Sequence, residues 1–175
     1  MRYLEGSPEE IAEFLRLTDG KSDTATDTTP ETAEVTATGT DMTSLDIGAF
    51  IDQRGRSSEG NARVYAYIKR VRSELGGVDI TTGQSERTRD GQSDYLMVHN
   101  DGKRRFGAVA YVKPANSGLT LRLTHDDVAD VPTKHIQFRA VRAGHQYVIN
   151  CPLTSDEAIE CAVELTKRAL DKVRR

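Results

Sequence analysis

The residues of this chain best suited to chemistry are three aspartates and a lysine near the middle of the sequence. Asp79 and Asp94 precede the tripeptide Asp101-Gly102-Lys103. Carboxylate oxygens are the ligands that hard divalent cations prefer, and a nearby lysine could neutralise charge on an anionic substrate. The pattern allows a metal-dependent enzyme, provided that the carboxylates converge in space.

The same residues have a simpler explanation in local structure. Asp-Gly is a preferred dipeptide of tight hairpin turns, so Asp101 and Gly102 predict a turn between two strands. The Asp-x-Lys pattern is similar to that of restriction-type nucleases, in which it lies within a strand rather than at a turn. We therefore keep a small metal-dependent nuclease-like enzyme as an alternative and expect the chain not to be an enzyme.

A second polar group lacks the spacing of a metal site. His125, Asp126 and Asp127 follow a predicted strand, and His135 and His145 come later. Zinc ligands usually occur in closely spaced pairs, which this group does not contain. Turn and capping roles explain the aspartates equally well, and we expect neither a metal nor a cofactor.

Two cysteines, Cys151 and Cys161, match neither a disulfide framework nor a pair of metal ligands. We expect both to be reduced and to fill small apolar spaces. The sequence contains no local motif for an activated serine or cysteine, and it has no glycine-rich phosphate loop.

Charge divides the chain into an acidic arm and a basic body. The first 50 residues hold 3 basic and 11 acidic residues, a formal charge of −8, whereas the remainder holds 21 basic and 16 acidic residues, a formal charge of +5. Arginine outnumbers lysine by 17 to 7, which favours bidentate contacts with phosphate or carboxylate. Genome composition alone would produce the same excess.

Basic side chains gather near the ends of the predicted strands. In residues 119–124 leucines alternate with polar residues, which places Arg122 on the outer face of the sheet. In residues 135–142 we expect Ile136, Phe138 and Ala140 to point inward and Arg139 outward. The predicted nucleic-acid-binding residues are Lys103, Arg104, Arg105, Arg122, Lys134, Arg139 and Arg142. Only Tyr111 is expected to share that face, so base stacking should be weak, and a solvated face would carry the same charges.

Hydrophobic periodicity predicts helices before and after a run of strands. Helical spacing predicts helices over residues 44–53, from about residue 59 to residue 75, and from residue 154 onwards. Between them the period changes to two, which predicts strands over residues 78–82, 95–99, 105–113, 119–124, 135–142 and 147–150. The predicted fold class is α+β: an antiparallel meander sheet of five or six strands with N- and C-terminal helices packed on one face.

Particular residues are expected to cap and orient the outer helices. We expect Ser44 to cap the first helix, and its apolar side to consist of Leu45, Ala49 and Phe50. Thr154 and Glu157 are expected to form a capping box at the start of the last helix. Gly76 and Gly77 predict the end of the middle helix.

A short amphipathic segment begins the chain. Ser7, Pro8 and Glu10 have the spacing of a helix start. A helix of about 11 residues is unstable alone in water, so its apolar stripe needs a surface to pack against. The predicted partner-binding residues are Tyr3, Leu4, Ile11, Phe14 and Leu15. Packing of this segment on its own domain is the alternative.

Residues 19–43 connect that segment to the domain. They are rich in Thr, Asp and Glu and contain almost nothing apolar, so burial cannot offset the entropy of ordering them. The predicted organisation is a docking segment over residues 1–18, a flexible acidic linker over residues 19–43 and a folded domain over residues 44–175.

The location of the protein follows from what the sequence lacks. It opens without a basic region followed by an apolar run, and no later stretch approaches the roughly 20 apolar residues of a membrane span. We expect a cytoplasmic protein without membrane contact. An exposed edge of the predicted sheet would allow pairing in a homodimer.

One resemblance concerns the region after residue 44. Its carrying residues are Tyr95, RFGAVAYVKP (residues 105–114), LTLRL (119–123) and YVINCPLTSDEAIECAVELTKRA (147–169), a span of about 75 residues without a catalytic signature. This pattern resembles a small uncharacterised α+β domain labelled "predicted transport protein", found alone or appended to restriction-type nucleases. The resemblance implies an accessory role near bacterial nucleic-acid-processing or defence proteins.

The function that we predict is that of a non-enzymatic accessory or adaptor module. It would dock a protein partner through residues 1–17 and contact nucleic acid through its basic face. Two alternatives remain: the nuclease-like enzyme, and a regulatory domain that binds a small ligand in a cavity lined by Tyr65, Tyr95 and Phe138.

Overall fold

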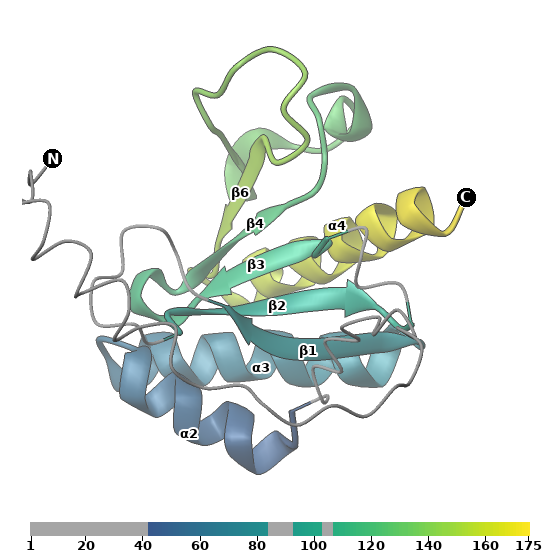
Figure 1. Cartoon of the computed structure of the whole chain (residues 1–175). Coiled ribbons are helices and arrows are strands. Elements are labelled where there is room, and N and C mark those ends of the chain that lie inside the picture. The colour runs from purple at the N-terminus through teal and green to yellow at the C-terminus, as the bar shows by residue number, and fades with distance from the viewer. Residues whose placement is uncertain (1–41, 84–92, 103–106) are drawn as a thin grey trace, which may run out of the picture. The chain divides into compact units, whose positions relative to one another are not determined.

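The architecture consists of one layer of helices and one antiparallel sheet, described by a computed structural model over residues 42–83, 93–102 and 107–175 (Figure 1). The helices in these residues are α2 (Ser44–Arg54), α3 (Ser58–Glu74) and α4 (Asp156–Arg174). The strands are β1 (Val78–Gly83), β2 (Tyr95–Asn100), β3 (Ala110–Lys113), β4 (Gly118–Leu121), β5 (Gln137–Phe138) and β6 (Ile149–Pro152). The predicted docking segment and nearly all of the predicted linker lie outside the described residues.

Helix α2 begins at the predicted residue, Ser44, but its cap lies one residue earlier, at Thr43. Thr43 accepts a hydrogen bond from the backbone N–H of Asp46, whose carboxylate accepts one in return from the backbone N–H of Thr43. This reciprocal pair requires an acceptor three residues after the cap, and Ser44 has Ile47 at that position. The prediction that Ser44 caps the helix is therefore wrong.

The buried side of α2 also differs from the prediction. Ile47 and Ile51 are its buried residues, whereas 87% of Leu45 is exposed. Ala49 is also exposed, whereas Phe50 is partly buried and packs against the core, so the predicted side is right only at Phe50.

Helix α3 follows the predicted pattern closely. Ser57 caps it by accepting from the backbone N–H of Gly60 (3.1 Å), and the predicted stripe of Val64, Ile68 and Val71 is buried. The helix ends at Glu74, before the two predicted glycines. Gly77 has φ +70°, a left-handed conformation that glycine adopts without a steric penalty.

Helix α4 presents a broad apolar face to the sheet, as predicted. Its buried apolar residues are Ala158, Ile159, Ala162, Val163, Leu165, Ala169 and Leu170. The cap is Ser155, which accepts from the backbone N–H of Ala158 (3.3 Å), so the prediction of a box between Thr154 and Glu157 is wrong by one residue. Ser155 has extended backbone angles suited to a cap, and the helix starts directly after it.

The sheet has the strand order β1-β2-β3-β4-β6-β5, with every neighbouring pair antiparallel. The first four strands follow chain order, and the turn between β3 and β4 is a short 3-10 helix (Pro114–Asn116). Strand β6 then pairs with β4, which leaves β5 at the edge. The predicted α+β meander with helices on one face is confirmed.

Three strands are shorter than sequence alternation predicts, and one is shifted. Strand β4 ends at residue 121 rather than 124, β3 begins at residue 110, and β6 spans residues 149–152 rather than 147–150. Strand β5 has two residues and pairs only with β6 at the edge of the sheet. Beyond it, the backbone N–H of Arg139 still donates to the carbonyl of Val148 (2.8 Å).

The predicted inward set of the β5 region is only partly right. Ile136 is buried, but Phe138 and Ala140 are exposed. Phe138 stacks on the ring of His125 at a centroid distance of 4.6 Å. Phe138, at the edge of the sheet, therefore packs against the His125 ring instead of against the core.

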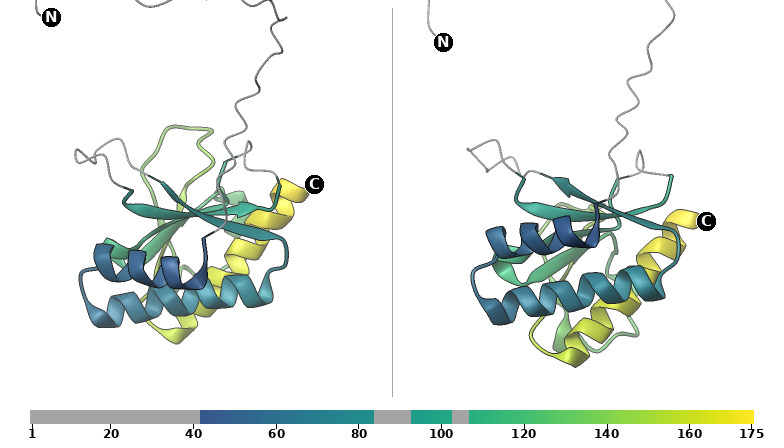
Figure 2. Two further views of the ribbon diagram at one scale, coloured as in Figure 1. Left: turned by 60° about the horizontal axis from the view of Figure 1, so that its bottom comes forward. Right: turned by 90° about the horizontal axis from the view of Figure 1, so that it is seen from below.

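All three helices lie on the same side of the sheet, as the two views of Figure 2 show. Helix α3 packs against both α2 and α4, and α4 also packs against the sheet. Leu96, Val98, Val112 and Leu121 point into the core between these layers and are fully buried. None of the helices within the described ranges combines the length and apolarity that a membrane crossing requires.

Candidate functional site

The face of the sheet opposite the helices carries the candidate site. Side chains alternate along each strand, so residues between the buried ones must point away from the helices. We define the open face by the outward residues of β2, β3, β4 and β6, together with Tyr147 just before β6 and Arg122 just after β4, whose charge acts on Tyr147. They are Tyr95, Met97, Tyr111, Lys113, Thr120, Arg122, Tyr147 and Asn150.

Three partly buried tyrosines form a continuous row across this face. The ring centroids of Tyr95 and Tyr111 lie 5.3 Å apart with an edge-to-face angle of 88°, and those of Tyr111 and Tyr147 lie 5.1 Å apart. The hydroxyl of Tyr147 donates to the carbonyl of Ala108 (2.7 Å), which fixes its ring. The prediction that Tyr111 is the sole aromatic on this face is therefore wrong.

A shallow pocket of about 190 Å³ adjoins the ring of Tyr111. We call it the open-face pocket, and its outward polar side chains are Lys113, Asn116, Thr120, Gln137 and Asn150. The hydroxyl of Thr120 donates to Oδ1 of Asn150 (2.7 Å), and Asn150 is the register partner of Gln137. The pocket thus offers two neighbouring side-chain amides, each with hydrogen-bond donors and an acceptor.

Lysine 113 lies at one border of the open-face pocket. Nζ of Lys113 is 3.4 Å from the carboxylate of Asp94 and 6.0 Å from the ring centroid of Tyr95. Its side chain is 42% exposed, so the ion pair with Asp94 leaves part of the ammonium group accessible to a ligand.

A larger hollow of about 640 Å³ lies where β4 meets the last turn of α4. The described residues that line this basic hollow are Arg122, Thr124, Gln146, Lys172, Val173, Arg174 and Arg175. Four of them are basic and none is acidic. Arg122 belongs to both the basic hollow and the open face, so the two regions are continuous at this residue.

Hydrogen bonds fix several of these cations in place. Arg174 donates from Nε to Oδ1 of Asn100 (2.9 Å) and from Nη2 to the carbonyl of Gly77 (3.0 Å), which joins the end of α4 to the neighbouring strands. Nε of Arg122 donates to Oε1 of Gln146 (2.7 Å). Fixed guanidinium groups lose less side-chain entropy on binding an anion than mobile ones.

The predicted basic residues do not all lie together. Arg139 donates to the carbonyl of Tyr147 (3.0 Å), so it lies next to the tyrosine row, and Arg142 is exposed in the turn that precedes it. Lys134 lies by the first turn of α4, where a hydrogen bond with Ser155 and the charges of Lys134 and His135 lower the pKa of Glu157. The basic hollow is at the other end of that helix, about 28 Å away at 1.5 Å per residue. Lys103, Arg104 and Arg105 lie outside the described residues.

Three cations of the hollow were missing from the predicted nucleic-acid set. Lys172, Arg174 and Arg175 end the last helix, where cations favour the helix dipole and need no further explanation. Only the fold reveals that this end of α4 lies beside Arg122.

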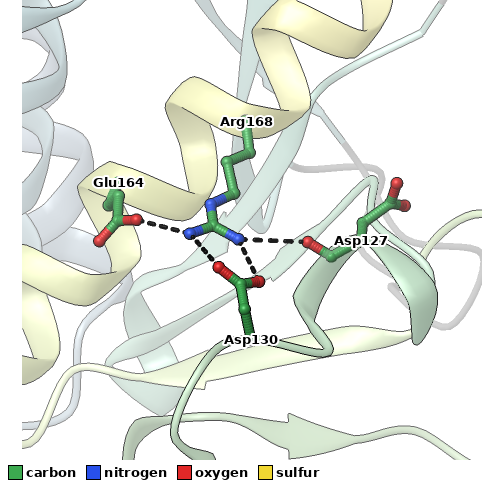
Figure 3. Close-up of polar contacts among 4 residues, drawn as sticks. All are labelled: Asp127, Asp130, Glu164 and Arg168. Carbon is green, nitrogen blue, oxygen red and sulfur yellow. Dashed lines mark hydrogen bonds and ion pairs between the residues drawn. The ribbon is translucent and has the colours of Figure 1, made fainter.

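Two aspartates of the segment after β4, Asp127 and Asp130, contact α4 (Figure 3). Arg168 forms a bidentate contact with Asp130 (2.7 and 3.0 Å) and a third hydrogen bond with Glu164 (2.8 Å). Nζ of Lys172 is 2.5 Å from the carboxylate of Asp127. Within residues 42–83, 93–102 and 107–175, no group of three or more His, Cys, Asp or Glu side chains has an arrangement that could hold a metal ion.

Of the two carboxylates that the nuclease alternative combines with Asp101, Asp79 lies near it and Asp94 does not. Asp79 on β1 is the register partner of His99, and the backbone N–H of Asp101 donates to the carbonyl of Gly77 (2.9 Å). Asp94 precedes β2 and Asp101 follows it, so the full strand separates them, about 20 Å at 3.3 Å per residue. Asp101 is exposed in the turn after β2, as the Asp-Gly dipeptide predicts. Lys103 lies outside the described residues.

The aromatic cavity of the ligand-binding alternative is likewise dispersed. Tyr65 lies on α3 in the helix layer, Tyr95 lies on the open face, and Phe138 contacts His125. These three side chains therefore do not line one cavity. The predicted partner-binding residues Tyr3, Leu4, Ile11, Phe14 and Leu15 lie outside the described residues.

Fold and site define an α+β domain with a three-helix layer and an open antiparallel sheet that bears a tyrosine row beside a basic hollow. Comparisons with protein-family models, with curated proteins and with solved structures found no match to this chain. Any function must therefore be argued from the site itself.

Proposed function

We propose that this protein is a non-enzymatic accessory module that binds nucleic acid through phosphate contacts in the basic hollow. The observation that carries the proposal is the convergence of Arg122 from the sheet with Lys172, Arg174 and Arg175 from α4 around one hollow. Arg122 lies at least 50 positions before the other three residues in the chain. Their convergence is a property of the fold rather than of a local charge run.

The chemistry of the hollow suits a phosphodiester backbone. Arginine presents planar donors that match phosphate oxygens, and three of the four cations are arginines. Among the contacts described, Lys172 of the hollow pairs with the carboxylate of Asp127. The exposed turn with Arg142 extends the positive charge beyond the hollow.

A salt titration of nucleic-acid binding tests the proposal. We would measure the fluorescence anisotropy of a labelled oligonucleotide with the full chain from low to moderate salt. Affinity should fall linearly in a double-logarithmic plot, and Arg122→Ala combined with Arg175→Ala should reduce the slope by about two, one for each lost phosphate contact.

A charge-matched control distinguishes an effect of the basic hollow on binding from an effect of the net charge of the protein. Lys69 is exposed on α3, and Arg56 is exposed in the turn between α2 and α3. The double variant Arg56→Ala/Lys69→Ala removes the same charge and should leave the slope unchanged. Absence of binding by the full chain at low salt, or equal weakening by the two double variants, would contradict the proposal.

The adaptor part of the proposal depends on residues 1–17 and stays a prediction. A pull-down would compare the full chain with a chain that lacks those residues, with and without nuclease treatment. Loss of a specific protein with the segment, independent of nuclease, is the expected result. An unchanged set of proteins would overturn partner docking and leave the nucleic-acid proposal intact.

A further inference from the structure

We infer that the open face binds single-stranded nucleic acid and receives one unstacked base against Tyr111 in the open-face pocket. This inference rests on the proposed function and names its substrate class. It is carried by the tyrosine row and by the two amides beside it, which phosphate binding alone does not require.

The tyrosine row supplies aromatic surface that a duplex cannot use. In a duplex the faces of the bases are stacked on one another, so an aromatic side chain on a flat sheet reaches only a base that has left the stack. Tyr95, Tyr111 and Tyr147 span β2, β3 and the segment before β6, with successive centroids 5.3 and 5.1 Å apart. Such a row is typical of surfaces that bind successive bases of one strand.

The open-face pocket adds hydrogen bonds suited to the edge of a base. Gln137 and Asn150 are opposite each other on β5 and β6, and both point away from the helices. Side-chain amides carry a donor and an acceptor side by side, which is the pattern that base edges display. The hydrogen bond from Thr120 holds Asn150 in place.

Arg122 connects this base site to the phosphate site. It lies two residues beyond Thr120, just after the end of β4, at a distance of about 7 Å along the extended chain. It also lines the basic hollow, and its charge acts on Tyr147, whose ring contacts Tyr111. A single strand could therefore place phosphates in the hollow and a base on Tyr111 at the same time.

Binding of matched strands by the full chain tests the inference. The probes are labelled single-stranded DNA and RNA of one sequence, the corresponding DNA duplex, and an abasic DNA strand of equal length and charge. We expect the strands with bases to bind at least roughly tenfold more tightly than the abasic strand, which is within the range of stacking on one aromatic side chain.

Substitutions at Tyr111 assign that preference to its ring. Tyr111→Leu should weaken binding of the base-containing strands by roughly tenfold and leave the abasic strand unaffected. Tyr111→Phe retains the ring and should restore binding. Tyr65→Leu is the matched control, because Tyr65 is an exposed tyrosine of the helix layer (43% exposed). Thermal unfolding of each variant verifies that the domain remains folded.

A spectroscopic readout complements the affinities. The chain has six tyrosines and no tryptophan, so its intrinsic fluorescence reports tyrosine alone. Base stacking should quench part of this emission, and Tyr111→Leu should remove most of the quenching.

The outcomes separate the two proposals. Absence of binding to every probe would overturn the proposed function. Equal binding of base-containing, duplex and abasic probes, or loss of affinity for all of them with Tyr111→Leu, would overturn the single-strand inference and leave phosphate binding in place. A difference between DNA and RNA would identify which strand is preferred.

Discussion

The hydroxyl of Tyr67 on α3 donates to Oγ1 of Thr166 on α4 across the buried contact between the two helices, at 2.7 Å. The direction follows because Thr166 uses its own hydrogen to bond the carbonyl of Ala162 (2.7 Å). Both side chains are fully buried, and burial raises the pKa of Tyr67 well above its usual range. The two helices that cover the sheet are thus joined by a polar contact inside the core.

Removal of the Tyr67 hydroxyl should destabilise the domain modestly. Tyr67→Phe keeps the ring and loses one buried hydrogen bond, which corresponds to about 1 kcal/mol of unfolding free energy. Urea unfolding followed by circular dichroism measures this change. Tyr65→Phe, which removes an exposed hydroxyl from the same helix, should have no measurable effect. Equal losses for the two variants would contradict a specific role of the buried bond.

Removal of the Thr166 hydroxyl should lower the free energy of unfolding by more than removal of the Tyr67 hydroxyl. The losses of stability from the two substitutions should not be additive. Thr166→Val leaves the Tyr67 hydroxyl buried without an acceptor, at a cost of about 1–3 kcal/mol. The double variant Tyr67→Phe/Thr166→Val leaves no buried hydroxyl of this pair without a hydrogen-bond partner. Its loss of stability should therefore be smaller than the sum of the losses of the two single variants. Strict additivity in urea unfolding would show that the two hydroxyls do not interact.

The features of the fold that repeat along the chain could be predicted from sequence. The stripe Val64, Ile68, Val71 in α3 and the alternation of Leu119 and Leu121 in β4 are periodic, and burial enforces such periods. Cap positions were wrong by one residue at Thr43 and Ser155 because neighbouring Ser and Thr residues are equally suited to cap a helix. At Thr43 the sequence held a deciding signal, because Asp46 three residues later completes a capping box; at Ser155 only the backbone geometry decides.

The candidate site could be predicted only in part. Alternation around Leu96 would have placed Tyr95 on the open face, so that signal was present in the sequence. Tyr147 could not be assigned in this way, because β6 begins only at Ile149 and strand parity does not apply before it. The basic hollow depends on the contact between Arg122 and the end of α4, and no local pattern encodes a contact over such a separation.

Acid should weaken the link between α4 and the loop that contains Asp127 and Asp130. The hydrogen bond from Arg168 lowers the pKa of Asp130. Partial burial acts to raise the pKa of Asp127, but hydrogen bonds from Lys172 and Thr124 outweigh it and the pKa is lowered. A lowered folded-state pKa stabilises the fold above the ordinary carboxyl value of 3.8, and this stabilisation is lost as the pH falls through the folded-state pKa.

Urea unfolding as a function of pH checks this dependence. Asp130→Asn should flatten the decline in stability between about pH 4 and pH 2 relative to the unsubstituted chain. Arg168→Gln removes the cation that lowers the pKa of Asp130 and should flatten it in the same way. The double variant should add nothing further, and an acid decline identical in all four proteins would contradict the coupling.

The two cysteines should differ in reactivity because their burial differs. Burial raises the pKa of Cys151 to about 12, and Cys161 is only partly buried. Thiolate is the reactive form, so Cys151 should remain unmodified in the folded protein. A thiol reagent at mildly alkaline pH should label Cys161 slowly under native conditions and both thiols in urea. Labelling of Cys161→Ser before unfolding would contradict this assignment.

The backbone of Gly77 should be intolerant of a side chain, whereas that of Gly76 should accept one. Gly77 has φ +70°, and an added Cβ would lie 3.0 Å from Nη2 of Arg174; at Gly76 a Cβ would meet no heavy atom within 4 Å. Gly77→Ala should therefore lower the free energy of unfolding by about 1–2 kcal/mol relative to Gly76→Ala.

Comparison of these two neighbours isolates strain in the folded state. Both substitutions restrict the unfolded chain equally, so the difference between their unfolding free energies in urea excludes that contribution. Arg174 donates to the carbonyls of both Gly76 and Gly77, so strain confined to Gly77 should loosen the basic hollow and weaken oligonucleotide binding more in Gly77→Ala than in Gly76→Ala. Equal stability of the two variants would show that the turn after α3 does not require a left-handed residue.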